Sequence, residues 1–521
     1  MKPEVRPDAC PRGLATRERE EPKMSREKLS RRNFLKAAGV AGPLFLTRRA
    51  GGNPGSAPPN VLILMADEHN PMYSSTYGDP YRRSVATPNM DRLAGMGTVF
   101  ESAYCPSPLC SPSRSAFMAG RWGHDIQVYS NCNVIEFDYP SYGKVLRQQG
   151  VYTAYAGKTD VYNRAPTLGF SELILAHDRA LPGDTHISRH PISTRPGGGA
   201  RRAKGFGVKD NPFRGDNRVV AAAEQWLSTK APALKQPWTL TVNVVKPHFP
   251  EFVTRELWDM FPHGGDLPQY GPDQPSANHP FALALRRFFE TNEFTNPDIR
   301  GLRRGYLGCV TQVDRQIGRL LDVLEGTGLL KNTVVAYTAD HGEMLGKFGM
   351  WWKCSLYEDS ARVPLIVAGP GFRAGARVKT PVSTMDLQAA MFRAIGARRP
   401  SNWAGTPLQD IKVNDPTHVM FAEYAGHGVP ANSYLIRKGK WKLIYYIGAP
   451  KQLFDLENDP NELKNLASER PDIAKGLEKD LRQICSPERE NQRTEEFIQR
   501  QLKAIREMQA ASRPKVQKQS A

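Results

Sequence analysis

The chain has 521 residues, 40% of them hydrophobic, which is enough for a large core and for one big domain or two to four smaller ones. Its net charge of +18 is uneven, because residues 1–50 hold 13 basic against 6 acidic residues and residues 481–521 hold 9 against 5. The mildly basic body between them suits an anionic substrate, or is a solvated surface, and we expect no nucleic acid partner. Seven cysteines in a chain of this length exclude a disulfide framework.

Residues 1–57 have the pattern of an export signal followed by a linker. Residues 30–36 read Ser-Arg-Arg-Asn-Phe-Leu-Lys, and an apolar run extends from Ala37 to Leu46. A paired arginine before a short apolar stretch is typical of twin-arginine export, and the run is too short to span a bilayer, which takes about 20 residues. We therefore expect a periplasmic or secreted protein without a stable membrane span. Its leader would engage the twin-arginine export machinery and would start at Met1 or Met24.

Between about residues 58 and 415, short apolar runs alternate with helical patterns. Runs rich in Val, Ile and Thr are typical of buried strands in a parallel sheet. The predicted strands are Val61–Ala66, Trp238–Val245, Thr333–Thr338 and Pro364–Ala368, and the predicted helices are Asn217–Leu227 and Tyr306–Leu324. This alternation predicts an α/β fold with a large central, mostly parallel sheet flanked by helices, over residues 58–415.

The pattern changes in two places. A Gly-, Pro- and Arg-rich segment from about Asp178 to Gly215 predicts a long loop, and loops of that length are usually functional or disordered. After about residue 415, Tyr434–Arg437 and Trp441–Tyr446 predict antiparallel strands, and a helix is expected from Asp472. We therefore expect a smaller C-terminal α+β subdomain with an antiparallel sheet over residues 416–485, and a charged helical tail over residues 486–521.

Polar residues follow three of the predicted strands at the point where each strand ends. They are Asp67, His248 and the adjacent Asp340 and His341. Because the carboxyl ends of parallel strands meet at one edge of a sheet, these side chains are expected to converge on one crevice. A single histidine or carboxylate at a strand end is more often a surface residue, so position alone predicts a site and not its chemistry.

Residues 110–114 read Cys-Ser-Pro-Ser-Arg, and a small, apolar stretch continues to Arg121. On this C-x-P-S-R motif the chain resembles the type I sulfatases of the alkaline-phosphatase-like superfamily. Further likeness at Thr87–Ala94, Asp340–Gly346 and Asp455–Leu466 extends the resemblance over roughly residues 60–470. In that family a formylglycine-generating enzyme oxidises the cysteine to an aldehyde. The resemblance therefore implies a sulfuric ester hydrolase with formylglycine at Cys110.

The resemblance also implies a nucleophile and a metal site. A hydrated aldehyde offers two hydroxyls on one carbon: one attacks sulfur, and the other loses its proton as the aldehyde re-forms and sulfate leaves. Asp67, Asp340 and His341, together with the modified Cys110, would hold one hard divalent cation, expected to be Ca²⁺. The cation would orient the sulfate and lower the cost of the attacking oxyanion.

Further family positions supply the residues around the sulfate group. Lys158 and Lys353 would bind sulfate oxygens, and His248 would lie beside the leaving oxygen as an acid or an electrostatic partner. Arg114 would stabilise the modified side chain and hold the metal carboxylates. The implied catalytic residues are therefore Cys110, Arg114, Lys158, His248 and Lys353.

Three positions depart from the usual family pattern. Glu68 stands where many sulfatases carry a second metal aspartate, and we leave it out of the ligand set because its longer side chain can point elsewhere. His341 stands where many carry asparagine. Asp160 stands where the common pattern has a histidine that helps deprotonate the second hydroxyl. Either Asp160 is a substitute base, or that role lies with another residue.

These departures, with the stretch from Glu423 to Leu456, resemble the arylsulfatase K branch, which removes 2-sulfate from glucuronate at glycosaminoglycan chain ends. The expected substrate is therefore a sulfated uronic-acid-containing glycan, or a sulfated small molecule. Choline-sulfatase-like enzymes share parts of the pattern, but a choline pocket needs an aromatic cage, and the sequence places none.

A phosphonate or phosphate diester hydrolase of the same superfamily is an alternative. So is an inactive glycan-binding relative, which only Asp160 favours. A redox or zinc role for Cys105 and Cys110 lacks further ligands.

Overall fold

The computed structural model of the chain describes residues 58–78, 85–132, 134–135, 139–161, 165–262 and 265–511. The predicted export signal, most of the linker, Cys10 and the end of the predicted tail lie outside these residues. The described residues all belong to one compact unit. Among them, no helix combines the length and the apolar character that a membrane span requires.

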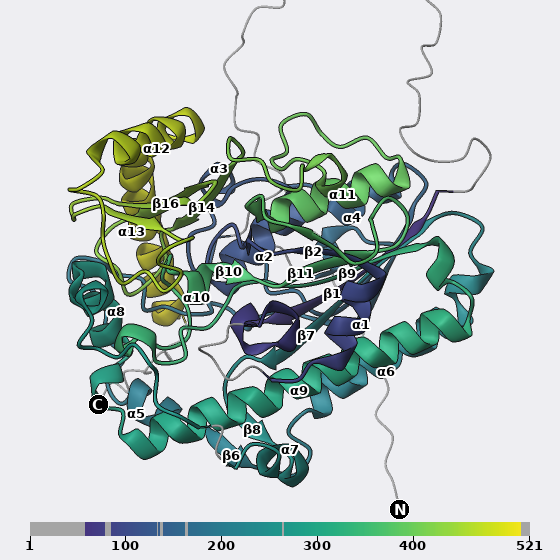
Figure 1. Cartoon of the computed structure of the whole chain (residues 1–521), viewed down its shortest axis with the longest axis horizontal. Helices are drawn as coiled ribbons and strands as arrows, with labels where there is room; N and C mark the ends of the chain where they lie inside the picture. Colours follow the sequence, from purple (N-terminus) through teal and green to yellow (C-terminus); the bar gives the residue numbers. More distant parts are fainter. Residues whose placement is uncertain are drawn as a thin grey trace, which may run out of the picture. The chain divides into compact units, whose positions relative to one another are not determined.

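An eight-stranded sheet forms the centre of the fold (Figure 1). Its strand order is β12-β2-β11-β9-β1-β7-β4-β5. The strands are β1 (Asn60–Asp67), β2 (Gly97–Phe100), β4 (Tyr152–Lys158), β5 (Glu172–His177), β7 (Trp238–Pro247), β9 (Thr333–Ala339), β11 (Leu365–Ala368) and β12 (Ala376–Val378). From β9 through β1, β7 and β4 to β5 the neighbours run parallel. Strands β1 and β9 are buried along their whole length, which explains their unbroken apolar sequences. The mostly parallel α/β sheet is confirmed.

Strand β11 departs from the parallel arrangement expected for the predicted strands. It pairs antiparallel with both β9 and β2. After β9 the chain stays at the carboxyl edge of the sheet, where its only α-helix before β11 is the single turn α10 (Glu358–Ala361). A parallel return needs a crossover to the opposite edge, so the chain re-enters the sheet from the edge at which β9 ended.

Helices cover both faces of the sheet (Figure 1). Helices α1 (Pro88–Met96), α6 (Arg214–Thr229) and α9 (Asn296–Gly326) lie on one face, and α2 (Cys110–Ala119), α4 (Tyr142–Arg147) and α11 (Thr384–Ile395) lie on the other. Both predicted helices are present, but α9 begins at Asn296 rather than near Tyr306. The cause is a capping box, in which Thr295 and Asp298 each bond the other's backbone N–H.

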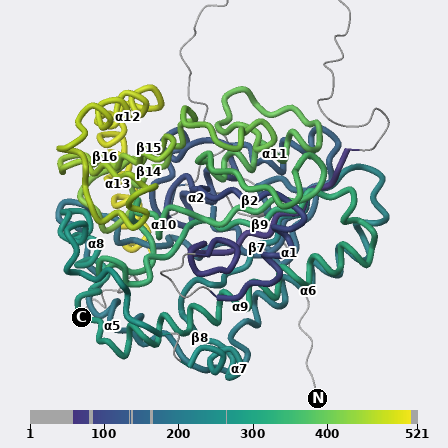
Figure 2. Tube along the Cα trace, in the orientation of Figure 1, coloured from purple at the N-terminus to yellow at the C-terminus, as the bar shows by residue number. Residues whose placement is uncertain are grey.

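A second, antiparallel sheet follows in the C-terminal part of the chain, as expected. Its strands, in order, are β14 (Val419–Tyr424), β15 (Ser433–Lys438), β16 (Trp441–Tyr446) and β17 (Gln452–Asp455). Helix α12 (Pro471–Ile484) packs on β15 and β16, and α13 (Pro487–Ala511) follows it. In Figure 2 these elements gather at one flank of the large sheet.

Small elements complete the fold. Strands β3 (Ala103–Tyr104), β10 (Arg362–Val363) and β13 (Val382–Ser383) form a three-stranded sheet, and β6 (Phe206–Val208) pairs with β8 (Glu251–Val253). The short helices are α3 (Gly123–Ile126), α5 (Gly198–Ala203), α7 (Arg255–Asp259) and α8 (Pro280–Phe288).

The segment predicted as a long loop, residues 178–215, therefore contains α5 and β6, and it is anchored to the C-terminal part of the chain. The buried Arg189 donates hydrogen bonds to the carbonyl of Ala425 (2.6 Å) and to Oδ1 of Asn432 (2.9 Å). It also forms an ion pair of 2.8 Å with Glu495 of α13. This anchoring holds in place a segment that lines the cavity described below.

Candidate active site

Polar side chains from distant parts of the chain meet at the carboxyl edge of the large sheet. Asp67 and Lys158 end β1 and β4, His248 follows β7, and Asp340 and His341 follow β9. None of these strand-end residues comes from an antiparallel strand of the large sheet, so the site lies where the parallel strands end. Cys110 is the first residue of α2, Arg114 lies one turn later, and Lys353 comes from the connection between β9 and β11.

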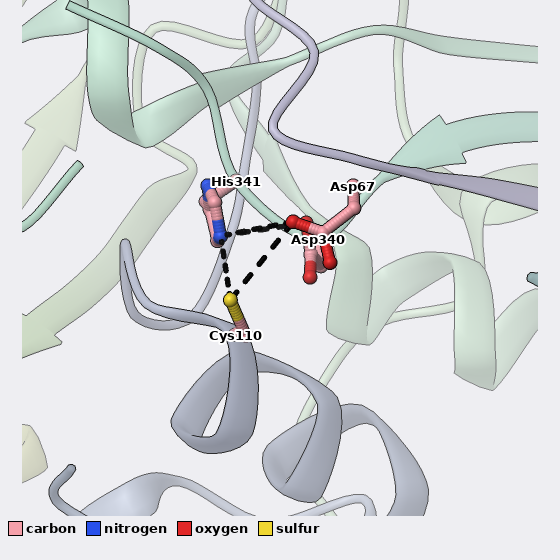
Figure 3. A group of neighbouring side chains, drawn as sticks. All are labelled: Asp67, Cys110, Asp340 and His341. Atoms are coloured by element: carbon pink, nitrogen blue, oxygen red, sulfur yellow. Dashed lines mark hydrogen bonds and ion pairs between the residues drawn. The ribbon is translucent and has the colours of Figure 1, made fainter. Parts of the chain in front are cut away.

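Four of these side chains form a buried cluster able to hold a metal ion: Asp67, Cys110, Asp340 and His341 (Figure 3). Nε2 of His341 lies 3.6 Å from an Oδ1 atom of each aspartate and 3.4 Å from Sγ of Cys110. Nδ1 of His341 donates to the carbonyl of Gly342 (3.0 Å), which leaves Nε2 free to ligate. Two carboxylates, one imidazole and one further oxygen fit a hard divalent cation.

Cationic side chains hold the two carboxylates in place. Nε of Arg114 donates to Oδ2 of Asp340 at 2.7 Å, and the guanidinium also lies 3.4 Å from Oδ2 of Asp67. Lys158 forms an ion pair with the same oxygen of Asp67. Burial raises the pKa of Asp67, but Lys158, His248 and Arg114 outweigh it and hold that pKa well below its usual value. Asp67 is therefore ionised and ready to ligate.

The position of Cys110 favours negative charge on its side-chain atom. Burial and Asp67 raise the pKa of the thiol, but Lys158, Lys353 and His341 outweigh them and lower it to about 5. Its location at the start of a helix acts in the same direction. An oxygen nucleophile at this position would experience the same stabilising field.

Glu68 lies beside the candidate metal cluster, and its carboxylate faces Lys353 and His248. Its Oε2 lies 3.2 Å from Nζ of Lys353 and 3.4 Å from Nε2 of His248, while its N–H donates to Asp340. Its φ of +69° is a left-handed conformation that costs a non-glycine residue about 1–3 kcal/mol. Asp67, Glu68 and His248 are close enough to hold a metal, but the charge of Lys353 competes with a cation there. Glu68 instead positions the lysine and the histidine.

Asp160 is held by two cations, which bears on whether it acts as a base. Arg179 binds both of its carboxylate oxygens at 2.9 and 2.7 Å, and Lys158 lies 3.2 Å away. Burial raises the pKa of Asp160, but Lys158 and Arg179 hold it well below its usual value. A carboxylate so firmly ionised is a weak base. The geometry instead indicates that Asp160 positions Lys158 and Ser111, whose hydroxyl donates to it at 3.0 Å.

Sequence reasoning missed two residues that support the site. Asn243 of β7 accepts a hydrogen bond of 2.9 Å from Arg114, and Arg179 fixes Asp160. Neither stands in a motif, and Arg179 lies in the segment predicted as a loop. Cys105 belongs to no candidate metal group among the described residues, and all six cysteines there are free.

A cavity of about 590 Å³ opens beside the cluster. His248 and Lys353 form part of its wall, and residues 179–202 contribute much of the remainder. The charged side chains of the lining are Arg179, Arg195, Arg201, Arg202 and Lys353 against a single carboxylate, Asp184. The lining of the cavity therefore carries more basic than acidic side chains.

The chain is similar to known families and proteins. Residues 59–397 match a family model described as Sulfatase, and residues 346–486 match one described as N-sulphoglucosamine sulphohydrolase, C-terminal. A choline-sulfatase of Rhizobium meliloti (strain 1021) is 32% identical over 429 residues, which cover 78% of this chain and 82% of that protein. An arylsulfatase K of Danio rerio is 27% identical over 453 residues, covering 82% and 83% respectively.

A solved phosphonate monoester hydrolase of Agrobacterium radiobacter has a TM-score of 0.65 at 23% identity, covering 81% of this chain and 94% of that one. At this identity the likeness shows the fold alone. The family match spans the strands and the motif that build the site, and the resemblance to arylsulfatase K extends over most of the chain. This chain belongs to the sulfatase family and is a sulfuric ester hydrolase of the type I group.

Proposed function

We propose that this sulfatase hydrolyses a sulfate monoester through a formylglycine made from Cys110, with one Ca²⁺, on a sulfated uronic-acid-containing glycan. The observation that carries the proposal is the position of Cys110. Its Sγ lies 3.4 Å from Nε2 of His341 and 3.9 Å from Oδ1 of Asp67, at the start of a helix and within the candidate metal cluster.

The residues divide the chemistry between them. A bound cation supplies Lewis acidity, because it polarises a sulfate oxygen and lowers the cost of an attacking oxyanion. Asp67, Asp340 and His341 would hold that cation. A hydrated formylglycine at Cys110 would supply two hydroxyls on one carbon. One would attack sulfur and give its proton to the alcohol as the S–O bond breaks, the other would lose its proton as the C=O bond re-forms and sulfate leaves, and water would then rehydrate the aldehyde.

Lys158 and Lys353 are suited to bind the sulfate oxygens as charge builds on them. His248 is suited to the leaving oxygen. Its Nδ1 donates to the carbonyl of Phe249 at 2.7 Å, which leaves Nε2 facing Glu68 at 3.4 Å. A proton on Nε2 would be within reach of the departing alkoxide.

The cavity supports an anionic glycan over a choline ester. Carboxylates pair with Arg179, Arg195 and Lys353 of its lining, but Arg201 and Arg202 have no ion-pair partner among the described residues, so the lining favours an anion over a quaternary ammonium. Its volume of about 590 Å³ lies in the range of pockets that enclose small ligands such as one or two sugar units. The choline-sulfatase relative therefore does not determine the substrate.

Two alternative functions differ in how they can be separated from a sulfatase. A phosphonate or phosphate diester hydrolase shares the fold and a tetrahedral anion, and only relative rates separate the two activities. An inactive glycan-binding relative would not need Cys110, Arg114 and Lys158 arranged around two buried carboxylates.

We also propose a route to the mature enzyme. The twin-arginine signal at residues 30–36 exports folded protein to the periplasm or the exterior. A formylglycine-generating enzyme would therefore act on Cys110 in the cytoplasm, before transport. Cytoplasmic precursor, trapped by blocking export, should already carry the aldehyde, and precursor with only thiol would disprove this order.

The test of the nucleophile is the mass of the tryptic peptide Leu93–Arg114 from protein made with a formylglycine-generating enzyme. Replacing CH₂SH by CHO lowers that mass by about 18 Da. The peptide also contains Cys105, so fragment ions must assign the change to Cys110, with Cys110→Ala as the control. Modified protein should release sulfate from a glucuronate 2-sulfate faster than phosphate from a diester. An unmodified cysteine under these conditions would favour the glycan-binding alternative.

A further inference from the structure

Most cations that line the cavity are neutralised within the protein. Arg179 is bound by Asp160, Arg195 forms an ion pair with Asp184, and Lys353 lies 3.2 Å from Glu68. Arg202 of α5 differs from them. Among the described residues, no carboxylate pairs with its guanidinium and no oxygen accepts its hydrogen bonds.

Arg202 contacts aromatic rings instead. Its guanidinium carbon lies 4.8 Å from the ring centre of Phe249, 5.0 Å from that of Trp352 and 5.9 Å from that of Phe289. Stacking on rings contributes about 0.5–2 kcal/mol but leaves the five N–H donors of an arginine without acceptors. Burial lowers the pKa of Arg202 and outweighs the charge of Glu68, which lies beyond ion-pair distance and raises that pKa. Arg202 is thus a partly buried cation at the cavity wall that forms no ion pair among the described residues.

Arg202 lies close to the residues proposed to bind the sulfate. Two of its aromatic contacts, Phe249 and Trp352, are the chain neighbours of His248 and Lys353. All five side chains line the same cavity. The Arg202 guanidinium carbon and Nζ of Lys353 lie 4.8 and 5.2 Å from the same ring centre, that of Phe249, so an anion bound by Arg202 would lie within reach of the sugar that carries the scissile sulfate.

We propose that Arg202 is a specificity-determining residue that binds a second anionic group on the sugar carrying the scissile sulfate. This inference rests on the proposed function and deepens it by naming the residue that selects the substrate. A planar guanidinium binds a carboxylate through two parallel hydrogen bonds, which suits the C6 carboxylate of a uronic acid, and it also binds a second sulfate.

The same geometry disfavours choline sulfate. Phe249, Phe289 and Trp352 offer the kind of aromatic faces that a quaternary ammonium needs, but Arg202 covers them. A choline headgroup would have to displace the guanidinium and then lie beside its charge. Arg202 therefore converts an aromatic cage into an anion site.

The test compares sulfate esters that differ only in the second group. Methyl glucuronide 2-sulfate carries a carboxylate at C6, methyl glucoside 2-sulfate carries a neutral hydroxymethyl group, and the 2,6-disulfate carries a second sulfate. The ratio of kcat/KM for an anionic ester to that for the neutral ester is measured in the calcium-loaded, formylglycine-containing enzyme. The wild type should prefer an anionic ester by about 30-fold or more. Which of the two is preferred identifies a carboxylate or a sulfate as the anion.

Arg202→Gln should bring this ratio close to one, mainly through KM, and Arg202→Lys should keep an intermediate ratio. Arg218→Gln, at an exposed arginine of α6, is the matched control and should keep the wild-type ratio. Calorimetry with calcium-loaded Cys110→Ala protein should show the same preference in binding, without turnover. A ratio near one in the wild type, or an unchanged ratio in Arg202→Gln, overturns the role of Arg202 and does not affect the proposed sulfatase function. So does a wild-type preference for choline sulfate. Failure of the wild type to release sulfate from any ester would instead contradict the proposed function.

Discussion

Nε of Arg114 donates a hydrogen bond of 2.7 Å to Oδ2 of Asp340, and both side chains are buried. The same guanidinium lies 3.4 Å from Asp67. One arginine, a single helical turn after Cys110, thus stabilises both carboxylates of the candidate metal site. Removal of one partner from a buried ion pair leaves the other charge uncompensated, so Arg114 should matter most when no cation is bound.

Arg114→Met is therefore expected to destabilise the metal-free protein by about 3–5 kcal/mol, and calcium should recover a large part of that loss. Thermal unfolding in chelator and in millimolar calcium measures both effects. The gap between the two melting temperatures should be wider in the variant than in the wild type, whereas Arg218→Met at the exposed position should leave it unchanged. An equal drop in melting temperature with and without calcium would show that a bound cation does not replace Arg114 in stabilising the two carboxylates.

Asp160 and Arg179 should behave as one functional unit. Asp160→Asn removes the carboxylate that holds Lys158 at 3.2 Å, and Arg179→Gln removes the group that orients that carboxylate. Each change should lower kcat/KM by about 10- to 100-fold, and the double variant should be little worse than either single one. Steady-state kinetics of the four proteins measure the coupling. If Asp160 were the base of the elimination step, Asp160→Asn would cost far more than Arg179→Gln and would shift the pH profile of kcat.

Local patterns in the sequence predicted the parts of the structure that local patterns determine. Unbroken apolar runs marked β1, β7 and β9, and the convergence of Asp67, His248 and Asp340 followed from the rule that parallel strands end at one edge. The direction of β11 could not be predicted in this way, because it depends on where a 25-residue connection returns to the sheet. The start of α9 was missed because its first turns carry a capping box rather than an apolar stripe.

Residues whose roles come from tertiary contacts were also missed. Arg179 and Arg202 lie in a segment that reads as a Gly- and Arg-rich loop, and nothing in its periodicity separates an arginine paired with Asp160 from one without a partner. Glu68 had no predicted role, since its direction depends on a left-handed backbone and on Lys353, 285 residues away in the chain. Such residues can be identified only after the elements that surround them are placed.

The buried pair of His124 and Glu423 should make stability depend on alkaline pH. Nδ1 of His124 lies 3.1 and 3.0 Å from the two carboxylate oxygens. Burial lowers the pKa of His124, but the charge and hydrogen bond of Glu423 outweigh it and raise the pKa to about 9, against 6.5 when unfolded. The folded state therefore holds the proton more tightly. The stabilisation, about 3 kcal/mol, is complete below pH 6.5 and is lost as pH rises through about 9.

Denaturant unfolding of the wild type and of His124→Gln measures this contribution. The difference in unfolding free energy between the two proteins should be large near pH 6 and should shrink by about 3 kcal/mol near pH 10. His190→Gln, at a side chain that is 70% exposed, should give a small difference at both pH values. A constant difference for His124→Gln would mean that the imidazole is neutral throughout this range.

The junction between the two sheets depends on Lys442 of β16. Its Nζ lies 2.8 Å from Glu358 of α10 and 2.7 Å from Glu462, and all three side chains are buried. Lys442→Met leaves two buried carboxylates without this cation and should lower the free energy of unfolding by about 3–5 kcal/mol. Lys440→Met is the matched control, because Lys440 directly precedes β16 and pairs with Asp455 near the surface, so its loss should cost less than about 1 kcal/mol. Denaturant unfolding of both variants compares the two costs. Similar small losses would mean that apolar packing, and not this ion pair, joins the C-terminal sheet to the segment that carries Lys353.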